Sequence, residues 1–297
     1  MTRVADHSPV LGTVVQTRID APEAIAGQAE HAILAEFSRL DAVFSTYRSD
    51  SELSRWALAG GGCSAELTEV LIAAEYWWQA SRGAFHPAIG AFRALWLRAA
   101  ERGEPPAREA LAALADSRPL PFRVVDGRVR QVGDCSGVDL NALAKGYIVD
   151  QAVAAGMAVP GVSSVVVNAG GDLVHAGAGR IEVGIEDPSR PYDNLPPRWR
   201  TSVENGALAT SGLARRGFRV SGTWFGHVID PRTGLPVEHT ASVSVRAPQA
   251  MDADALATIC GVLPAGEALA FLADRDGCEC LIVDDEGGVH ASPRWFS

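Results

Sequence analysis

Residues 226–234 read Gly-His-Val-Ile-Asp-Pro-Arg-Thr-Gly, and they follow a predicted hairpin whose tight turn is Ser221-Gly222. His227 lies at the end of the second strand of that hairpin, because Asp230-Pro231 is typical of a turn. An imidazole titrates near neutral pH without help from its surroundings, so His227 is a candidate general base. Taken alone, it is explained equally well as a histidine that is hydrogen-bonded at a strand end.

A helix is predicted from about Asp252 to Val262, and it contains Asp254 and Thr258. Residues four positions apart project from the same face of a helix, so the carboxylate and the hydroxyl lie side by side. Both are hard oxygen ligands of the kind that Mg²⁺ prefers. Together with His227, this pair predicts metal-assisted phosphate chemistry.

A glycine-rich turn, Asn168-Ala-Gly170-Gly171-Asp172, follows a predicted buried strand. Its backbone N–H groups are not screened by side chains, which suits the close approach of a phosphate or a planar heterocycle. Two glycines after a strand more often form a simple turn, and a lone lysine such as Lys145 more often lies at the surface. In combination with the Asp254 helix, however, they predict one pocket for a phosphorylated ligand and a bound cation.

The rest of the chain contains short strands, hairpins and amphipathic helices. Ser49 followed by Glu52 predicts a capping box and a new helix, and Ser64 predicts a second helix start. Strands are predicted at residues 11–18, 122–125, 128–132, 164–167, 173–175, 181–185, 241–246 and 278–283, and helices at 33–44, 64–83, 252–262 and 266–272. Residues 136–147 lead into a further predicted helix that runs to about residue 155.

These elements do not follow a strict β-α-β alternation, so the sequence predicts an α+β fold with a mixed sheet and packed helices. Residues 1–12 are expected to form an N-terminal tail. Residues 13–297 are expected to form a single domain, with a helical excursion around residues 92–118.

Composition excludes several classes of function. The net charge of −10 argues against binding to nucleic acid, which requires a basic surface. No apolar run approaches the roughly 20 residues that a membrane-spanning helix needs. The five cysteines are scattered and odd in number, and the N-terminus lacks an apolar segment typical of a signal peptide. We therefore expect a cytoplasmic protein with reduced cysteines and no membrane segment.

Five blocks, taken together and in order, resemble the FAD:protein FMN transferase family (ApbE-type flavin transferases). The blocks are Tyr47-Arg-Ser-Asp-Ser-Glu-Leu-Ser-Arg, Gly83-Ala-Phe-His-Pro, Asp139-Leu-Asn-Ala-Leu-Ala-Lys-Gly-Tyr, Val167-Asn-Ala-Gly-Gly-Asp, and Thr210-Ser-Gly followed by residues 227–234. The resemblance runs from about residue 13 to residue 293. The family usually has two glycines where this chain has Asn141 and Ala142.

The resemblance implies an ApbE-like architecture related to the T-fold. It also implies an enzyme that transfers FMN from FAD to a Ser or Thr hydroxyl of a flavoprotein and releases AMP. By similarity, Mg²⁺ or another divalent cation is held by the Ala144 carbonyl, Asp254 and Thr258, and His227 is the catalytic base. The residues that would contact FAD are Tyr47, Asp139, Lys145, Asn168, Gly170, Gly171, Asp172, Thr210, Ser211 and His227.

Two other functions remain open from the sequence. The first is an FAD diphosphatase of the same fold, in which water replaces the acceptor alcohol. The second is a flavin-binding or storage protein that does not turn over. The presence of both Asp254 and His227 favours catalysis, because pure binding needs no base.

Overall fold

The computed structural model describes residues 1–116, 119–190, 195–212 and 216–296. Its helices are α1 (Glu23–Phe44), α2 (Glu52–Ala59), α3 (Ala65–Ala80), α4 (Gly90–Arg102), α5 (Arg108–Asp116), α6 (Asn141–Met157), α7 (Ala250–Val262) and α8 (Ala265–Ala273). Its strands are β1 (Thr2–Val10), β2 (Thr13–Asp20), β3 (Phe122–Val125), β4 (Arg128–Gln131), β5 (Ser164–Ala169), β6 (Asp172–Gly177), β7 (Ile181–Ile185), β8 (Trp199–Val203), β9 (Gly206–Gly212), β10 (Gly217–Val220), β11 (Thr223–Gly226), β12 (Thr240–Ala247), β13 (Glu279–Asp284) and β14 (Val289–Ala291).

The central sheet has eight strands among the described residues, in the order β1-β2-β5-β6-β9-β12-β13-β14. Every strand pairing in this part of the chain is antiparallel. The α+β class is therefore confirmed, whereas the predicted mixed sheet is corrected to an antiparallel one. The interleaving of helices and hairpins does not reveal strand direction, and in the structure each strand runs against the strand beside it.

The N-terminal residues are not the predicted tail. Residues 2–10 form β1, which pairs with β2 from Thr2 opposite Asp20 to Val10 opposite Thr13. Arg3 anchors this edge strand to α1 through ion pairs of 2.7 Å with Glu23 and Glu30. Sequence periodicity did not reveal the strand because its residues are exposed or only half-buried, as is usual at a sheet edge.

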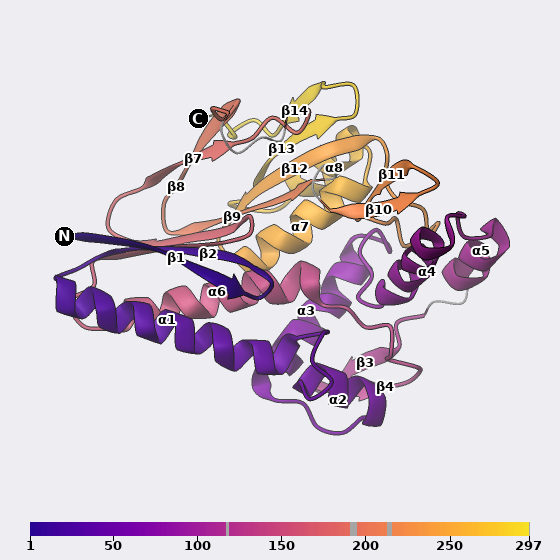
Figure 1. Cartoon of the computed structure of the whole chain (residues 1–297), viewed down its shortest axis with the longest axis horizontal. Helices are drawn as coiled ribbons and strands as arrows, with labels where there is room; N and C mark the ends of the chain where they lie inside the picture. Colours follow the sequence, from indigo (N-terminus) through magenta and orange to yellow (C-terminus); the bar gives the residue numbers. More distant parts are fainter. Residues whose placement is uncertain (117–118, 191–194, 213–215, 297) are drawn as a thin grey trace.

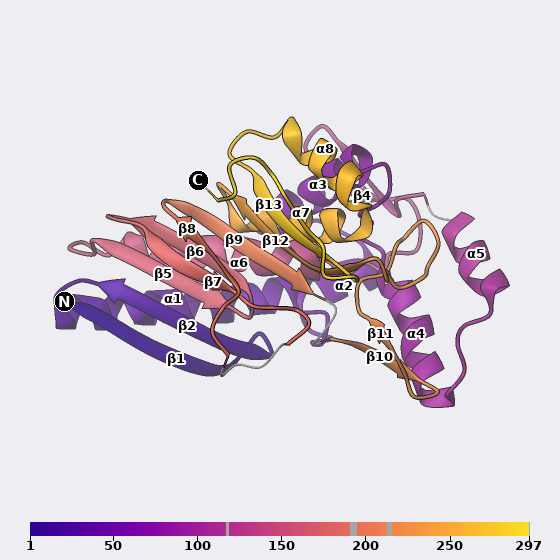
Figure 2. The same cartoon turned by 90° about the horizontal axis from the view of Figure 1, so that it is seen from above.

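Helices cover one face of the sheet, as Figure 1 shows for α1 and α6 beneath the strands. The main hydrophobic core lies between this helical layer and the sheet, with Ile33, Val149, Val167 and Leu256 fully buried. β7 and β8 form a two-stranded sheet on the opposite face (Figure 2). A smaller cluster around Leu173, Leu208 and Trp295 joins it to the central sheet.

The structure confirms one predicted helix start and corrects two others. Ser64 caps α3 as predicted, because its side chain accepts a hydrogen bond from the Leu67 backbone N–H. The cap of α2 is Ser51 rather than Ser49, since Ser51 Oγ accepts from Ser54 N at 3.0 Å. The first helix was predicted over residues 33–44, but α1 already begins at Glu23.

A third, separate hydrophobic cluster supports one end of the molecule. It contains Phe92 and Trp96 of α4, Leu111 of α5, and Phe218 of β10. Figure 1 shows α4, α5, β10 and β11 together at this end. α4 and α5 fall in the range predicted for the helical excursion, whose residues 117 and 118 lie outside the described part of the chain.

Candidate functional site

The site is built where α6 crosses α7. A Cβ atom added at Gly146 of α6 would lie 2.2 Å from the carbonyl oxygen of Ala250, so only glycine permits this close approach of the two helices. Asp150, one turn further along α6, accepts hydrogen bonds from the backbone N–H groups of Ala250 and Met251 at 2.9 and 3.0 Å. These groups otherwise lack partners at a helix N-terminus, so Asp150 fixes the start of α7.

This crossing places Lys145 between two carboxylates from different elements. Its Nζ lies 2.5 Å from Asp172 Oδ2 at the start of β6 and 3.3 Å from Asp254 Oδ2 on α7. The side chains of Asp172 and Asp254 are nearly inaccessible to solvent. A buried carboxylate is stable only when it is paired, which explains why the lysine lies here rather than at the surface.

The charges of this cluster shift one another's titration. Burial lowers the pKa of Lys145, but the negative charges of Asp172 and Asp254 outweigh that effect and raise it above its ordinary value. Burial, followed by repulsion from Asp172, raises the pKa of Asp254. Two carboxylates with one ammonium group leave the cluster short of positive charge, and a bound cation would supply it.

The donors around Asp254 fit a small divalent cation. Asp254 Oδ2 is buried and lacks a hydrogen bond of good geometry, although it faces Lys145 at 3.3 Å. Thr258 lies one turn further along α7, and the Ala144 carbonyl belongs to the adjoining turn of α6. No group of three or more His, Cys, Asp and Glu that could hold a metal is found among the described residues. A cation here would therefore be held by one carboxylate with hydroxyl and carbonyl oxygens, which are all ligands that Mg²⁺ accepts.

The glycine turn lies beside this cluster, between β5 and β6. Gly170 and Gly171 have φ angles of +62° and +108°, backbone conformations that residues with a side chain rarely adopt. Asn168 Oδ1 accepts a hydrogen bond from Gly171 N at 3.2 Å, and Thr210 N donates to the Gly171 carbonyl at 3.2 Å. The turn is thus fixed to β9 and ends at Asp172, the partner of Lys145.

Residues of β9 continue the site. Thr210 is exposed, and its Oγ1 shares a 2.8 Å hydrogen bond with Ser244 Oγ on β12. Ser211 lines a narrow gap together with Val228 and Gly261. Because Val228 follows His227 directly and Gly261 follows Thr258 by less than one turn, this gap connects β9, the histidine segment and α7.

His227 follows β11, and its backbone N–H donates to the Arg216 carbonyl at 3.1 Å. The imidazole is accessible to solvent, yet the chain around it lowers its pKa to about 4 through desolvation, followed by the positive charges of Arg216, Lys145 and Arg93. Lys145 of the carboxylate cluster is thus among the charges that lower this pKa. A neutral imidazole at physiological pH can accept a proton.

Two predicted site residues are not joined to the cluster. Asp139 lies just before α6, where its Oδ1 accepts from Asn141 N at 2.9 Å and its backbone N–H donates to the Pro87 carbonyl at 2.7 Å. It therefore shapes the N-terminus of the helix that holds Lys145. Tyr47 is 82% exposed in the turn after α1. No hydrogen bond or ion pair among the described residues joins Tyr47 to the cluster.

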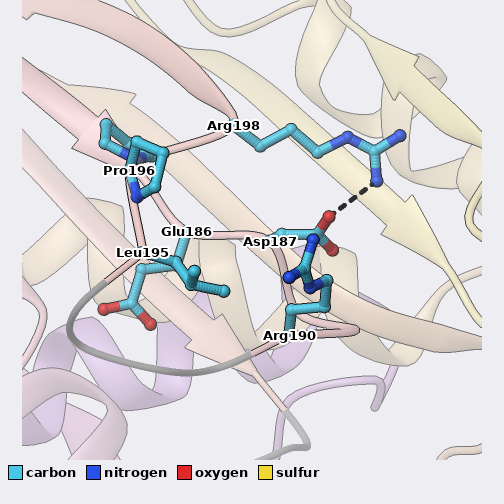
Figure 3. Close-up of a pocket in the computed structure, with 7 residues that line it drawn as sticks. Glu186, Asp187, Arg190, Leu195, Pro196 and Arg198 are labelled. Carbon is cyan, nitrogen blue, oxygen red and sulfur yellow. Dashed lines mark hydrogen bonds and ion pairs between the residues drawn. The ribbon is translucent and has the colours of Figure 1, made fainter.

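A surface pocket lies away from these side chains. It has a volume of about 240 Å³, and its lining residues Glu186, Asp187 and Arg198 come from the connection between β7 and β8 (Figure 3). Arg198 there binds Asp187 at 3.0 Å. Within the described part of the chain, the candidate site is therefore recognised by the convergence of charged groups and not by this pocket.

Sequence reasoning missed the residues that hold the site in place. Gly146 belongs to the family-like stretch Asp139–Tyr147, but nothing in the pattern indicates the helix that contacts it. Asp150 is an acidic residue directly after the buried apolar run Tyr147-Ile148-Val149, and this was the signal that could have identified it. Trp96, which bonds to the histidine segment, resembles any core residue of an amphipathic helix.

Comparison with solved structures identifies the class of fold. The ApbE protein of Thermotoga maritima superposes with a TM-score of 0.86 at 25% identity, covering 99% of this chain and 97% of that one. The apo flavinyl transferase ApbE of Pseudomonas stutzeri gives a TM-score of 0.74 at 26% identity, covering 98% and 94%. The architecture is therefore that of the ApbE flavin transferases.

Sequence comparison identifies the family. Residues 11–282 match the ApbE family, and this chain belongs to it. An FAD:protein FMN transferase of Treponema pallidum is 31% identical over 98% of this chain and 88% of its own length. An FAD:protein FMN transferase of Escherichia coli K12 is 27% identical over 95% and 79%.

Proposed function

We propose that this protein is an FAD:protein FMN transferase that requires Mg²⁺ or another divalent cation. The observation that carries the proposal is the convergence of Lys145, Asp172 and Asp254 beside the glycine turn, in a chain of the ApbE family. Relatives that span most of this chain have the same activity in their names. Transfer of a flavin phosphate requires charge neutralisation of the kind that this cluster can provide.

In the proposed reaction, a Ser or Thr hydroxyl of the acceptor flavoprotein attacks the phosphorus on the FMN side of the FAD pyrophosphate. A bond forms between the hydroxyl oxygen and that phosphorus, and the bond from phosphorus to the bridging oxygen breaks. AMP leaves with that oxygen. The hydroxyl proton passes to His227, whose neutral imidazole can accept it.

Each remaining residue has a role in binding or orientation. Lys145 would offset the negative charge of the pyrophosphate, and the glycine turn at Gly170 and Gly171 would present backbone N–H groups to it. The Ala144 carbonyl, Asp254 and Thr258 would hold the cation. When bound, such an ion stabilises negative charge on the transferring and leaving phosphate oxygens.

The test is to incubate the purified protein with FAD, Mg²⁺ and a candidate acceptor flavoprotein, followed by mass spectrometry of the acceptor. We expect the acceptor to gain the mass of one FMN and one AMP to be released per attachment. An acceptor whose target threonine is replaced by valine controls for non-covalent flavin. An unmodified acceptor in the presence of all reactants would contradict the proposal.

The same experiment separates the two alternatives. An FAD diphosphatase would release FMN and AMP rapidly without an acceptor, at a rate that no acceptor changes. A storage protein would bind FAD and release neither product. His227 favours turnover, because its lowered pKa of about 4 keeps the base in its proton-accepting form.

The setting of the reaction remains a prediction. No helix in the described parts of the chain is long and apolar enough to cross a membrane. The cytoplasmic location, the Ser or Thr nature of the target and the identity of the metal are parts of the proposal that the acceptor experiment and fractionation of cells can test.

A further inference from the structure

Trp96 of α4 contacts the segment that carries His227 on both sides of the histidine. Upstream, its ring centroid lies 5.0 Å from that of Phe225 on β11 and 6.1 Å from that of Phe218 on β10. Downstream, its indole Nε1 donates a 2.9 Å hydrogen bond to the Gly234 carbonyl. The side chain is 2% exposed, so both contacts are shielded from water.

The downstream contact depends on a turn that closes back toward α4. Asp230 N donates to the Leu235 carbonyl at 2.9 Å, and Gly234 N donates to the Asp230 carbonyl at 2.8 Å. Gly234 has a φ angle of +72°, and a Cβ atom there would lie 2.4 Å from Phe92. The glycine therefore permits both the turn and its close packing on α4.

The upstream contact depends on the hairpin. β10 and β11 pair through Phe218 opposite Phe225, and Gly226 is the last residue of β11. Phe218 is a buried member of the separate hydrophobic cluster, and Phe225 packs against that cluster. Val228, directly after His227, packs in the main core, so the small cluster supports the histidine segment through Trp96, the shared member of both contacts.

We propose that Trp96 is a positioning residue for His227, and that it holds the imidazole at the reacting hydroxyl by clamping Phe225 and the Gly234 carbonyl together. This inference rests on the proposed transfer reaction. Trp96 takes no part in bond making, because its contacts are with protein groups. A displacement of about 1 Å at a catalytic group can lower a rate by on the order of 100-fold, so loss of the clamp should be visible in kcat.

The first test compares Trp96→Phe with the wild type. Phenylalanine keeps an aromatic ring but cannot donate to the Gly234 carbonyl. We expect kcat to fall by about 10- to 100-fold with an unchanged KM for FAD. A rise in KM with an unchanged kcat would overturn the proposal, because it would place Trp96 in substrate binding.

A double-mutant cycle distinguishes positioning from general structural damage. If Trp96 acts through His227, Trp96→Phe should lower kcat in the wild type and cause no further loss in His227→Ala. Damage to the fold would lower both backgrounds by the same factor. An equal loss in the two backgrounds would therefore contradict the proposal.

Trp295→Phe is the matched control. Trp295 is 1% exposed and belongs to the cluster on the opposite face of the sheet. Its indole N–H lacks a hydrogen-bond partner among the described residues, so this variant changes ring volume without removing a donor bond. We expect kcat close to the wild-type value, and a loss as large as that of Trp96→Phe would contradict a specific role for Trp96.

Phe225→Leu provides a second route if Trp96→Phe does not fold. It removes the aromatic contact on the upstream side and leaves Trp96 and its hydrogen bond in place. We expect a smaller fall in kcat than for Trp96→Phe, with an unchanged KM for FAD and no further fall in the His227→Ala background. A kcat that Phe225→Leu leaves unchanged in both backgrounds would count against the clamp. The wild-type measurement keeps the two hypotheses apart, since a wild-type protein without FMN transfer fails the proposed function and not the clamp.

Discussion

Lys145 Nζ and Asp172 Oδ2 lie 2.5 Å apart, and they join the second turn of α6 to the first residue of β6. The pair connects α6 to the glycine turn that precedes β6. Because Asp254 of α7 shares the same ammonium group at 3.3 Å, three elements converge on one charge. This convergence places the candidate site at the junction of helices and sheet.

The first prediction concerns the metal. EDTA should abolish FMN transfer and Mg²⁺ should restore it, because two carboxylates around Lys145 leave negative charge uncompensated. Asp254→Ala should lose most of the activity and remain folded, since the change removes a buried charge that Asp172 repels. Activity is measured by AMP release and folding by circular dichroism. Full activity of Asp254→Ala in EDTA would refute the metal assignment.

The second prediction concerns His227. Replacement by alanine should lower kcat by about 10²- to 10⁴-fold, the usual contribution of a general base, with little change in FAD affinity. In the wild type, the pKa of about 4 keeps the imidazole neutral above that pH, so kcat/KM should stay level from neutral pH downward and fall as the pH approaches 4. A pH profile of initial rates tests this. A parallel collapse of FAD affinity in His227→Ala would indicate a binding role instead.

The third prediction concerns Asp150, whose pKa is raised from 3.8 to about 6 by burial, against the effect of two backbone hydrogen bonds. Between these two values the unfolded chain loses a proton that the folded protein keeps. The free energy of unfolding should therefore fall as the pH rises from about 4 to about 6, by at most about 3 kcal/mol, and stay level above that range.

Urea unfolding at several pH values measures this effect. Asp150→Asn is the control, because the amide keeps one acceptor for the N-terminus of α7 but cannot titrate. The difference in unfolding free energy between the wild type and this variant should depend on pH only within the stated window. If this difference is constant with pH, any pH dependence of the wild-type unfolding free energy comes from a group other than Asp150.

The fourth prediction concerns Tyr47, which is 82% exposed and separate from the charged cluster. The family resemblance implies that Tyr47 contacts FAD. If its ring stacks on the ligand, Tyr47→Ala should weaken FAD binding by roughly 5- to 150-fold, the effect of losing about 1–3 kcal/mol of stacking. The thermal midpoint should not change, because an exposed side chain contributes little to the core. Quenching of FAD fluorescence measures the affinity, and an unchanged affinity would remove Tyr47 from the site.

Local sequence patterns were sufficient for features that depend on neighbouring residues. The hairpin around Ser221-Gly222 is present as β10 and β11, and Ser64 caps α3 as its spacing indicated. Asp254 and Thr258 lie on α7, one turn apart. Turn chemistry, capping and helical period act over a few residues, so the sequence by itself determines them.

Tertiary structure alone decided how these pieces meet. The edge strand β1 shows no apolar alternation, and its place depends on pairing with β2. The ion pairs of Lys145 require α7 to cross α6 at Gly146, and the bond from Trp96 to Gly234 joins residues 138 positions apart. Such contacts are set by burial and by the need to pair charges removed from water, and neither has a signature in the local sequence.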